Sequence, residues 1–158
     1  MKFLVSCIYA PKNNKTLGHY LELPSTYKKS NNKNEKPKIL IVDDEPDINI
    51  LYHFVLERAG YTVQSYENPL LALSKFIPCY YDAAILDIRM PEMNGLVLYN
   101  ELRKRDRKVK ICFLTAGEVD VKKLVEDKYD ELDKVLFFQK PMRNNDLVQM
   151  VSRIMTSH

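Results

Sequence analysis

Residues 38–46 read KILIVDDEP, and residues 83–87 follow the same pattern as AAILD, a short apolar run that ends in aspartate. Further apolar runs occur at residues 61–66, 109–114 and 135–138. Four of the five runs contain almost no polar residues. This pattern is typical of strands that are buried on both faces of a parallel sheet, whereas a sheet with one face in water shows strict alternation.

Helix-length segments separate the apolar runs. Pro46 and Gly60 bound the first segment, in which apolar residues recur at steps of three and four: Ile48, Leu51, Val55 and Ala59. Four more helices are predicted, from Asn68 to about Ile77, after Gly95, from residue 118 to about 129, and from about residue 144 with Leu147, Met150, Val151 and Ile154 on one face. The alternation predicts an α/β protein with a doubly wound (βα)5 parallel sheet of five strands.

The first 37 residues differ from the rest of the 158-residue chain. They are rich in Asn, Lys and Pro, and seven lysines against two glutamates give them a net charge of +5, while the whole chain carries +3. Such a composition favours a disordered leader, although a basic tail can also attract nucleic acid or anionic lipid. We therefore predict a basic extension at residues 1–37 and one folded domain at residues 38–158.

The overall composition excludes some classes of protein. Hydrophobic residues make up 46% and charged residues 28%, and no apolar run approaches the roughly 20 residues of a membrane span. The three cysteines are odd in number and far apart, which argues against a disulfide framework and against a four-cysteine zinc site. A cytoplasmic protein that does not insert into membranes is the simplest interpretation.

Polar side chains that could take part in catalysis or binding follow four of the predicted strands. They are Asp43, Asp44, Asp87, Thr115 and Lys140. The carboxyl ends of parallel strands lie along one edge of a sheet, so we expect these side chains to share a pocket. Three carboxylates in one pocket repel each other, and a hard divalent cation such as Mg²⁺ relieves that repulsion. The set of acids, hydroxyl and ammonium therefore favours a site that places phosphate beside a metal ion.

Four segments in this order resemble the receiver domains of two-component response regulators. They are IVDDEPD at 41–47, LDIRMPEMNG at 86–95, LTA at 114–116 and KP at 140–141. The resemblance covers about residues 38–156, and it implies a flavodoxin-like sheet with the strand order 2-1-3-4-5. We also expect a stand-alone receiver, because the chain ends near the point where the fifth helix must stop.

The resemblance implies a role for each matching residue. Asp87 would accept the phosphoryl group, and Mg²⁺ would be held by Asp43, Asp44, Asp87 and the backbone carbonyl of Arg89. Lys140 and Thr115 would contact phosphoryl oxygens.

Two further expectations concern the switch and the backbone. Phe137 stands where the family places an aromatic residue that moves together with Thr115. The Lys140–Pro141 peptide bond is expected to be cis.

The resemblance implies a signalling function rather than turnover of a substrate. A sensor histidine kinase or a phosphotransfer protein would supply the phosphoryl group, and only self-phosphorylation and self-dephosphorylation are expected. The signal would pass to a downstream protein through the face formed by the fourth helix, the fifth strand and the fifth helix. Direct DNA binding is not expected, and the protein would be a monomer or a dimer linked to phosphorylation.

Other readings of the same residues remain open. Asp44 or Glu45 ahead of Pro46 would also suit a helix N-cap, and Phe137 would also suit plain core packing. A haloacid-dehalogenase-like phosphatase uses a similar set of residues, but it carries a second aspartate where this chain has Arg89. A degenerate receiver that binds partners without phosphorylation is the third alternative.

Overall fold

The computed structural model describes residues 35–117 and 135–156. Its strands are β1 (Lys38–Val42), β2 (Thr62–Tyr66), β3 (Ala83–Asp87), β4 (Lys110–Thr115) and β5 (Leu136–Gln139). Its helices are α1 (Pro46–Arg58), α2 (Pro69–Lys75), α3 (Gly95–Arg105) and α5 (Asn144–Thr156). Each element lies within a few residues of its predicted position. The helix predicted from residue 118 to about 129, and most of the predicted N-terminal extension, lie outside the described residues.

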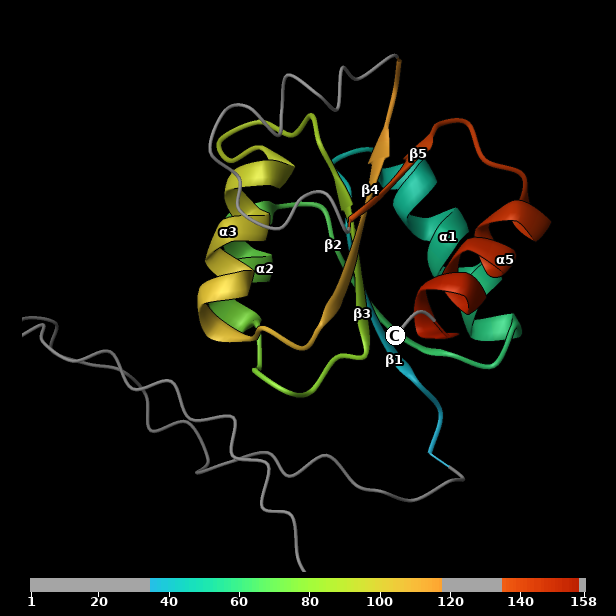
Figure 1. The fold of residues 1–158 in the computed structure, drawn as a ribbon. Helices are drawn as coiled ribbons and strands as arrows, with labels where there is room; N and C mark the ends of the chain where they lie inside the picture. The colour runs from blue at the N-terminus through green and yellow to red at the C-terminus, as the bar shows by residue number, and fades with distance from the viewer. Residues whose placement is uncertain (1–34, 118–134, 157–158) are drawn as a thin grey trace, which may run out of the picture.

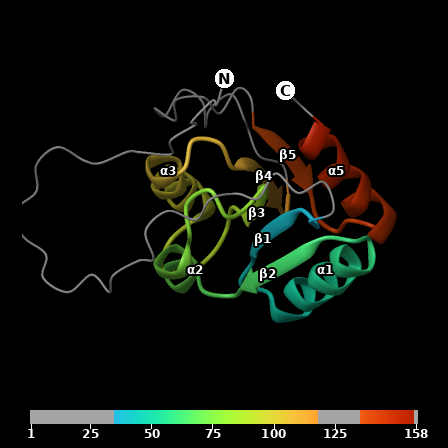
Figure 2. The same ribbon diagram turned by 90° about the horizontal axis from the view of Figure 1, so that it is seen from below.

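The five strands form one parallel sheet in the order β2-β1-β3-β4-β5. Figure 1 shows the sheet nearly edge-on, with α2 and α3 on one face and α1 and α5 on the other. The view from below in Figure 2 shows the same pairs of helices on opposite faces of the sheet. The predicted fold class and strand order are therefore confirmed.

The central strands are buried because helices cover both faces of the sheet. Every residue of β3 is buried, and only the first residue of β1 and of β4 is partly exposed. Successive side chains point to opposite faces, so Leu40 and Phe113 pack under α2 and α3, while Ile41 and Leu114 pack under α1 and α5. The alternation therefore determines the face of the sheet to which the last side chain of each strand points.

The predicted apolar face of α1 was partly wrong. The buried residues of this helix are Asn49, Tyr52 and Leu56, whereas Leu51 is 45% exposed. The spacing of apolar residues could not predict that Asn49 is buried, because its side chain is polar. Two hydrogen bonds to backbone carbonyls satisfy that side chain and make its burial possible. Among the described residues, no helix is long and apolar enough to cross a membrane.

Candidate functional site

Four strands bring their terminal side chains together at the carboxyl edge of the sheet. Asp43 follows β1, Asp87 ends β3, Thr115 ends β4 and Lys140 follows β5. All four residues are buried, with exposed fractions between 1% and 7%. Since β1, β3, β4 and β5 are neighbours in the sheet, residues separated by almost 100 positions in the chain form one pocket.

The ammonium of Lys140 lies at the centre of this pocket. Its Nζ is 2.7 Å from Asp43 Oδ2, 2.9 Å from Glu45 Oε1 and 3.1 Å from Asp87 Oδ2. The Lys140 side chain is only 4% exposed, so these contacts are shielded from bulk water. The contact with Asp43 Oδ2 is an ion pair without hydrogen-bond geometry, since this oxygen accepts no hydrogen bond among the described residues.

Burial and the neighbouring charges shift the pKa values of the buried groups in the pocket. Burial raises the pKa of the Asp43 carboxyl above its ordinary value, although Lys140 and the backbone N–H of Glu45 act in the opposite direction. Burial by itself lowers the pKa of Lys140, but its contacts with Asp43 and Glu45 outweigh burial and the net pKa is raised. Lys140 therefore stays charged at neutral pH, and an additional cation would relieve the unfavourable burial of Asp43.

The acidic residues of the pocket fit a metal ion. Asp43, Asp44 and Asp87 each offer a carboxylate oxygen, and these three atoms lie within 4.8 Å of one another. Hard carboxylate oxygens at such spacing suit Mg²⁺, which keeps several waters and takes only a few protein ligands. The Thr115 Oγ1 is buried and has no hydrogen-bond partner among the described residues, so its hydroxyl is available to another ligand in the pocket.

The loop from β3 to α3 folds closely over the backbone of Asp87. The Gly95 N–H donates to the Ile88 carbonyl at 2.9 Å, and a Cβ at Gly95 would lie only 2.1 Å from the Asp87 carbonyl oxygen. The Asn94 side chain caps α3 by accepting from the Val97 N–H. The Arg89 N–H donates to Asp87 Oδ1 at 3.3 Å, while its role as a carbonyl ligand stays a prediction.

The remaining predicted site residues lie on β5 and directly after it. Phe137 is half-buried and stacks on Phe113, with 5.1 Å between the ring centroids. Phe113, Phe137 and Thr115 share the face of the sheet that α2 and α3 cover, so packing and a coupled movement are both compatible with this arrangement. The Lys140–Pro141 peptide bond is cis.

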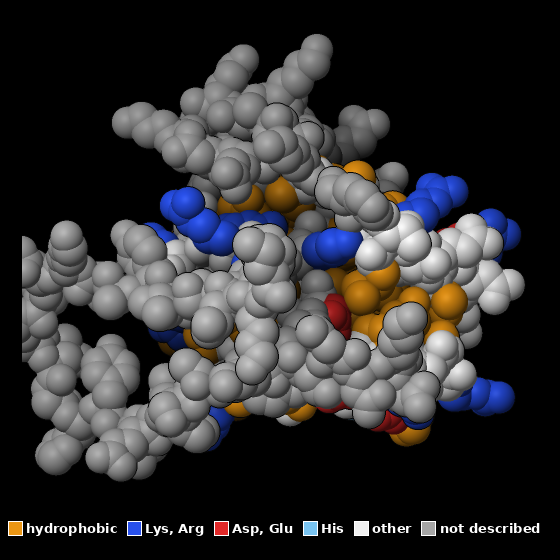
Figure 3. Space-filling view, turned by 60° about the horizontal axis from the view of Figure 1, so that its bottom comes forward, with side chains coloured by type: hydrophobic (Ala, Val, Ile, Leu, Met, Phe, Trp, Pro, Cys, Tyr) orange, Lys and Arg blue, Asp and Glu red, His pale blue; other side chains and the backbone are white. Residues whose placement is uncertain are grey.

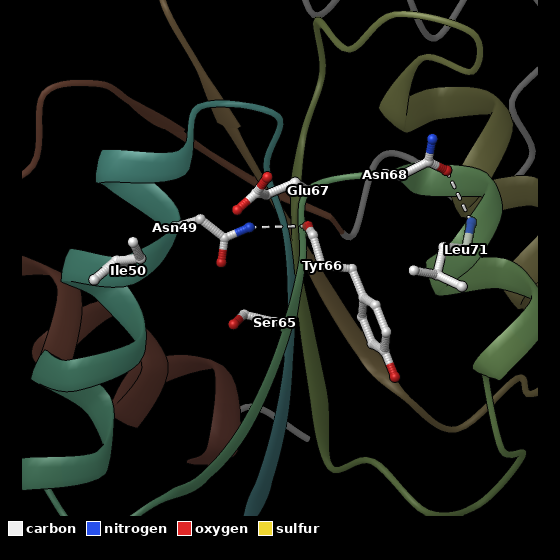
Figure 4. Close-up of a pocket in the computed structure, with 7 residues that line it drawn as sticks. All are labelled: Asn49, Ile50, Ser65, Tyr66, Glu67, Asn68 and Leu71. Atoms are coloured by element: carbon white, nitrogen blue, oxygen red, sulfur yellow. Dashed lines mark hydrogen bonds between the residues drawn. The ribbon is translucent and has the colours of Figure 1, made fainter.

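Asn49 holds the backbone at the rim of the pocket, and the sequence analysis did not predict this role. Its Nδ2 donates to the carbonyls of Asp43 and Tyr66, both at 2.9 Å, and so it joins the ends of β1 and β2. Figure 4 shows the hydrogen bond from Asn49 to Tyr66 beside an open hollow of about 330 Å³ between α1, β2 and α2. The hollow is lined by Asn49, Ile50, Ser65, Tyr66, Glu67, Asn68 and Leu71. The hollow contains none of the four buried strand-end residues, so it is separate from the acidic pocket.

The fold and the acidic pocket define an α/β domain with a candidate metal site at the carboxyl edge of its sheet. Comparison with known proteins identifies its family. Residues 39–152 match the response regulator receiver domain, and the chain therefore belongs to this family. Members of the family bind Mg²⁺ in an acidic pocket, take part in two-component signalling, and interact with histidine kinases or phosphotransfer proteins and with downstream targets.

Similar proteins include both short and long chains. Sporulation initiation phosphotransferase F of Bacillus subtilis is 32% identical over 117 residues, which cover 73% of this chain and 91% of that protein. The transcriptional regulatory protein TdiR of Thauera aromatica is 29% identical over 117 residues, which cover 72% of this chain and 49% of TdiR. The chain thus spans about half or less of several longer relatives, and 35% of RprY of Bacteroides fragilis.

Solved structures show the same fold. The response regulator TrrA of Thermotoga maritima, in complex with Mg²⁺ and BeF, has a TM-score of 0.63 and 35% identity, and the match covers 75% of this chain and 98% of TrrA. The chemotaxis protein CheY4 of Vibrio cholerae has a TM-score of 0.65 and 25% identity, and the match covers 76% of this chain and 99% of CheY4.

Proposed function

We propose that Asp87 accepts a phosphoryl group from a phosphohistidine of a sensor kinase or phosphotransfer protein, or from a small phosphodonor. An oxygen of the Asp87 carboxylate attacks phosphorus, a new P–O bond forms, and the bond from phosphorus to the donor breaks. The donor leaves as imidazole or as a carboxylate, and no atom changes its oxidation state. The reaction is nucleophilic catalysis by a carboxylate, and it makes the chain a phospho-accepting signalling domain rather than an enzyme with turnover.

Each residue of the pocket has a defined part in this transfer. Asp43, Asp44, Asp87 and the carbonyl of Arg89 would hold Mg²⁺, whose charge offsets the negative charge on the phosphoryl oxygens. Lys140 provides a positive charge beside Asp87, and the Thr115 hydroxyl donates to a phosphoryl oxygen. The 3.1 Å contact between Lys140 Nζ and Asp87 Oδ2, inside a pocket with two further aspartates, is the observation that carries the proposal.

The phosphodonor must approach the open side of this pocket. Helix α1 begins three residues after Asp43, and its outer side carries Ile50, Leu51 and Phe54 with exposed fractions of 54%, 45% and 61%. Figure 3 shows exposed hydrophobic side chains on the side of the molecule that α1 and α5 form. A protein that delivers a phosphoryl group to Asp87 comes close to the start of α1. We therefore expect the exposed apolar side chains of α1 to form part of that contact.

The readout of phosphorylation is a shift in conformation. Thr115 would move toward the phosphoryl group, Phe137 would follow, and the surface of β5 and α5 would change for a downstream protein. The predicted contribution of a fourth helix lies outside the described residues. The similarity to phosphotransferase F, of which the match covers 91%, favours a single-domain cytoplasmic relay that acts through protein contacts without binding DNA, as a monomer or as a dimer linked to phosphorylation.

Titration with beryllofluoride in saturating Mg²⁺ tests the pocket directly, because this anion imitates a phosphoryl group on an aspartate. Wild-type protein is expected to bind it, as seen by ¹⁹F NMR, and Asp87→Asn protein is expected not to bind. Acetyl phosphate should label the wild type alone. Binding of neither reagent by the wild type would favour the degenerate receiver, and equal labelling of the variant would show that Asp87 is not the acceptor.

A further inference from the structure

Three carboxylates surround the ammonium of Lys140 in the resting pocket, and those of Glu45 and Asp87 accept hydrogen bonds from it. An ammonium has three N–H donors, and three carboxylate oxygens lie within 3.1 Å of Lys140 Nζ. Two belong to the expected members of the site, Asp43 and Asp87. The third belongs to Glu45, which neither the sequence analysis nor the family resemblance had placed in the pocket. A phosphoryl oxygen that binds Lys140 therefore competes with these carboxylates for the ammonium.

Burial decides which contact is the easiest to replace. The side chains of Asp43 and Asp87 are 1% and 5% exposed, whereas the side chain of Glu45 is 53% exposed. Asp87 loses its carboxylate charge when it forms the acyl phosphate, so the comparison lies between Asp43 and Glu45. A buried Asp43 carboxylate that lost its ammonium would be left as an uncompensated charge, which is costly. The Glu45 carboxylate can turn into water and regain its hydration, so it is the contact that yields.

The position of Glu45 also shows that its side chain is not needed to begin α1. Glu45 is the N-cap residue of the helix, yet its side chain makes no capping hydrogen bond. Pro46 at the first helical position is already suited to start a helix. The backbone N–H of Glu45 donates to Asp43 Oδ1 at 3.1 Å, which anchors the residue beside the pocket while its carboxylate reaches Lys140.

We propose that Glu45 is a resting-state latch on Lys140. Its carboxylate holds one N–H donor of Lys140, and its negative charge opposes the arrival of the phosphoryl anion beside that ammonium. Phosphorylation therefore includes an exchange in which Glu45 leaves Lys140 for solvent. The latch lowers the affinity of the pocket for phosphoryl groups and holds the unphosphorylated state in place. This inference rests on the proposed function, because it assumes that Lys140 binds a phosphoryl oxygen.

The test compares Glu45→Gln and Glu45→Ala with Asp47→Asn. Asp47 is exposed in the first turn of α1 and is not one of the three carboxylates that contact Lys140, so its variant controls for the loss of one negative charge near the pocket. Beryllofluoride affinity is measured by ¹⁹F NMR in Mg²⁺ that saturates each variant. We expect Glu45→Gln and Glu45→Ala to bind about threefold to tenfold more tightly than Asp47→Asn, the size of one partly exposed ion pair. In a Lys140→Met background the gain should vanish, because the two side chains act through one contact.

A second readout reports the contact without any phosphoryl analogue. With ¹⁵N-labelled lysine, the Lys140 ammonium signal should shift in Glu45→Gln protein and stay in place in Asp47→Asn protein. If the wild type binds beryllofluoride but the Glu45 variants equal Asp47→Asn in affinity, the latch is wrong and the proposed function stands. If the wild type binds no beryllofluoride, the proposed function fails, and the latch fails with it even where the ammonium signal shows the contact.

Discussion

Replacement of Gly95 by alanine tests whether the close approach of α3 to Asp87 is essential. A Cβ at this position would lie 2.1 Å from the Asp87 carbonyl oxygen and 2.9 Å from its carbonyl carbon. A relaxed carbon–oxygen contact is about 3.3 Å, so the start of α3 and the end of β3 must separate by roughly 1 Å. Both atoms belong to the backbone, and no side chain can turn away to relieve the overlap.

The separation of α3 from β3 lowers the free energy of unfolding. Forcing a new atom into a packed contact typically costs about 1 to 3 kcal/mol and occasionally more, and an overlap with two backbone atoms belongs to the severe cases, at about 3 to 5 kcal/mol. The better helix propensity of alanine returns less than about 1 kcal/mol. We expect Gly95→Ala to lower the free energy of unfolding by about 2 to 4 kcal/mol. The shift would also displace Asp87, so labelling by acetyl phosphate should fall even at temperatures where the variant is folded.

Gly60→Ala is the matched control for this prediction. Gly60 has a φ of +96°, and a Cβ there would meet nothing within 4 Å. The Gly60→Ala variant is therefore destabilised only by its left-handed backbone, by about 1 to 2 kcal/mol. Urea unfolding followed by circular dichroism measures both variants. A Gly95→Ala protein as stable as Gly60→Ala, with normal labelling, would refute the argument that this close approach matters.

Three further predictions concern single side chains. Thr115→Val should change the unfolding free energy by less than about 1 kcal/mol, because the buried hydroxyl has no partner to lose among the described residues, yet it should weaken beryllofluoride binding; a large loss of stability would contradict this. Asp44→Asn should weaken Mg²⁺ binding at least about tenfold, as measured by calorimetry, and unchanged affinity would exclude Asp44 as a ligand. Burial raises the pKa of Tyr81 above its ordinary value of 10.0, so above pH 10 the folded state keeps a proton that the unfolded state loses, and stability falls as pH rises. Tyr81→Phe should make that fall shallower by up to about 1.4 kcal/mol per pH unit in urea titrations, and an unchanged slope would count against this assignment.

The sequence predicted most of the fold because strands buried on both faces leave a clear pattern. The apolar runs that end at Asp43, Asp87 and Thr115 correspond to β1, β3 and β4, with boundaries shifted by at most one residue. Parallel pairing then requires their ends to meet at one edge, so the position of the pocket followed from the order of residues alone. The face of α1 was harder to predict, because Asn49 is buried by hydrogen bonds that depend on the ends of two different strands.

The contact between Glu45 and Lys140 could not be predicted from the sequence. Glu45 looked like a helix cap, since it precedes Pro46 and stands at the start of an amphipathic segment. Whether its side chain turns toward the helix or toward the pocket depends on where Lys140 lies, 95 residues away. Local pattern carries no information about that distance, which is set only when β1 and β5 are held in the same sheet.

The central claim is that Asp87 accepts a phosphoryl group, and locating that group tests it most directly. Wild-type protein is incubated with acetyl phosphate and Mg²⁺, the acyl phosphate is reduced with borohydride, and peptides are sequenced by mass spectrometry. The account predicts reduction to homoserine at position 87 and no such product without Mg²⁺. Homoserine at position 43 or 44 instead, or none in protein that is folded and saturated with Mg²⁺, would contradict it.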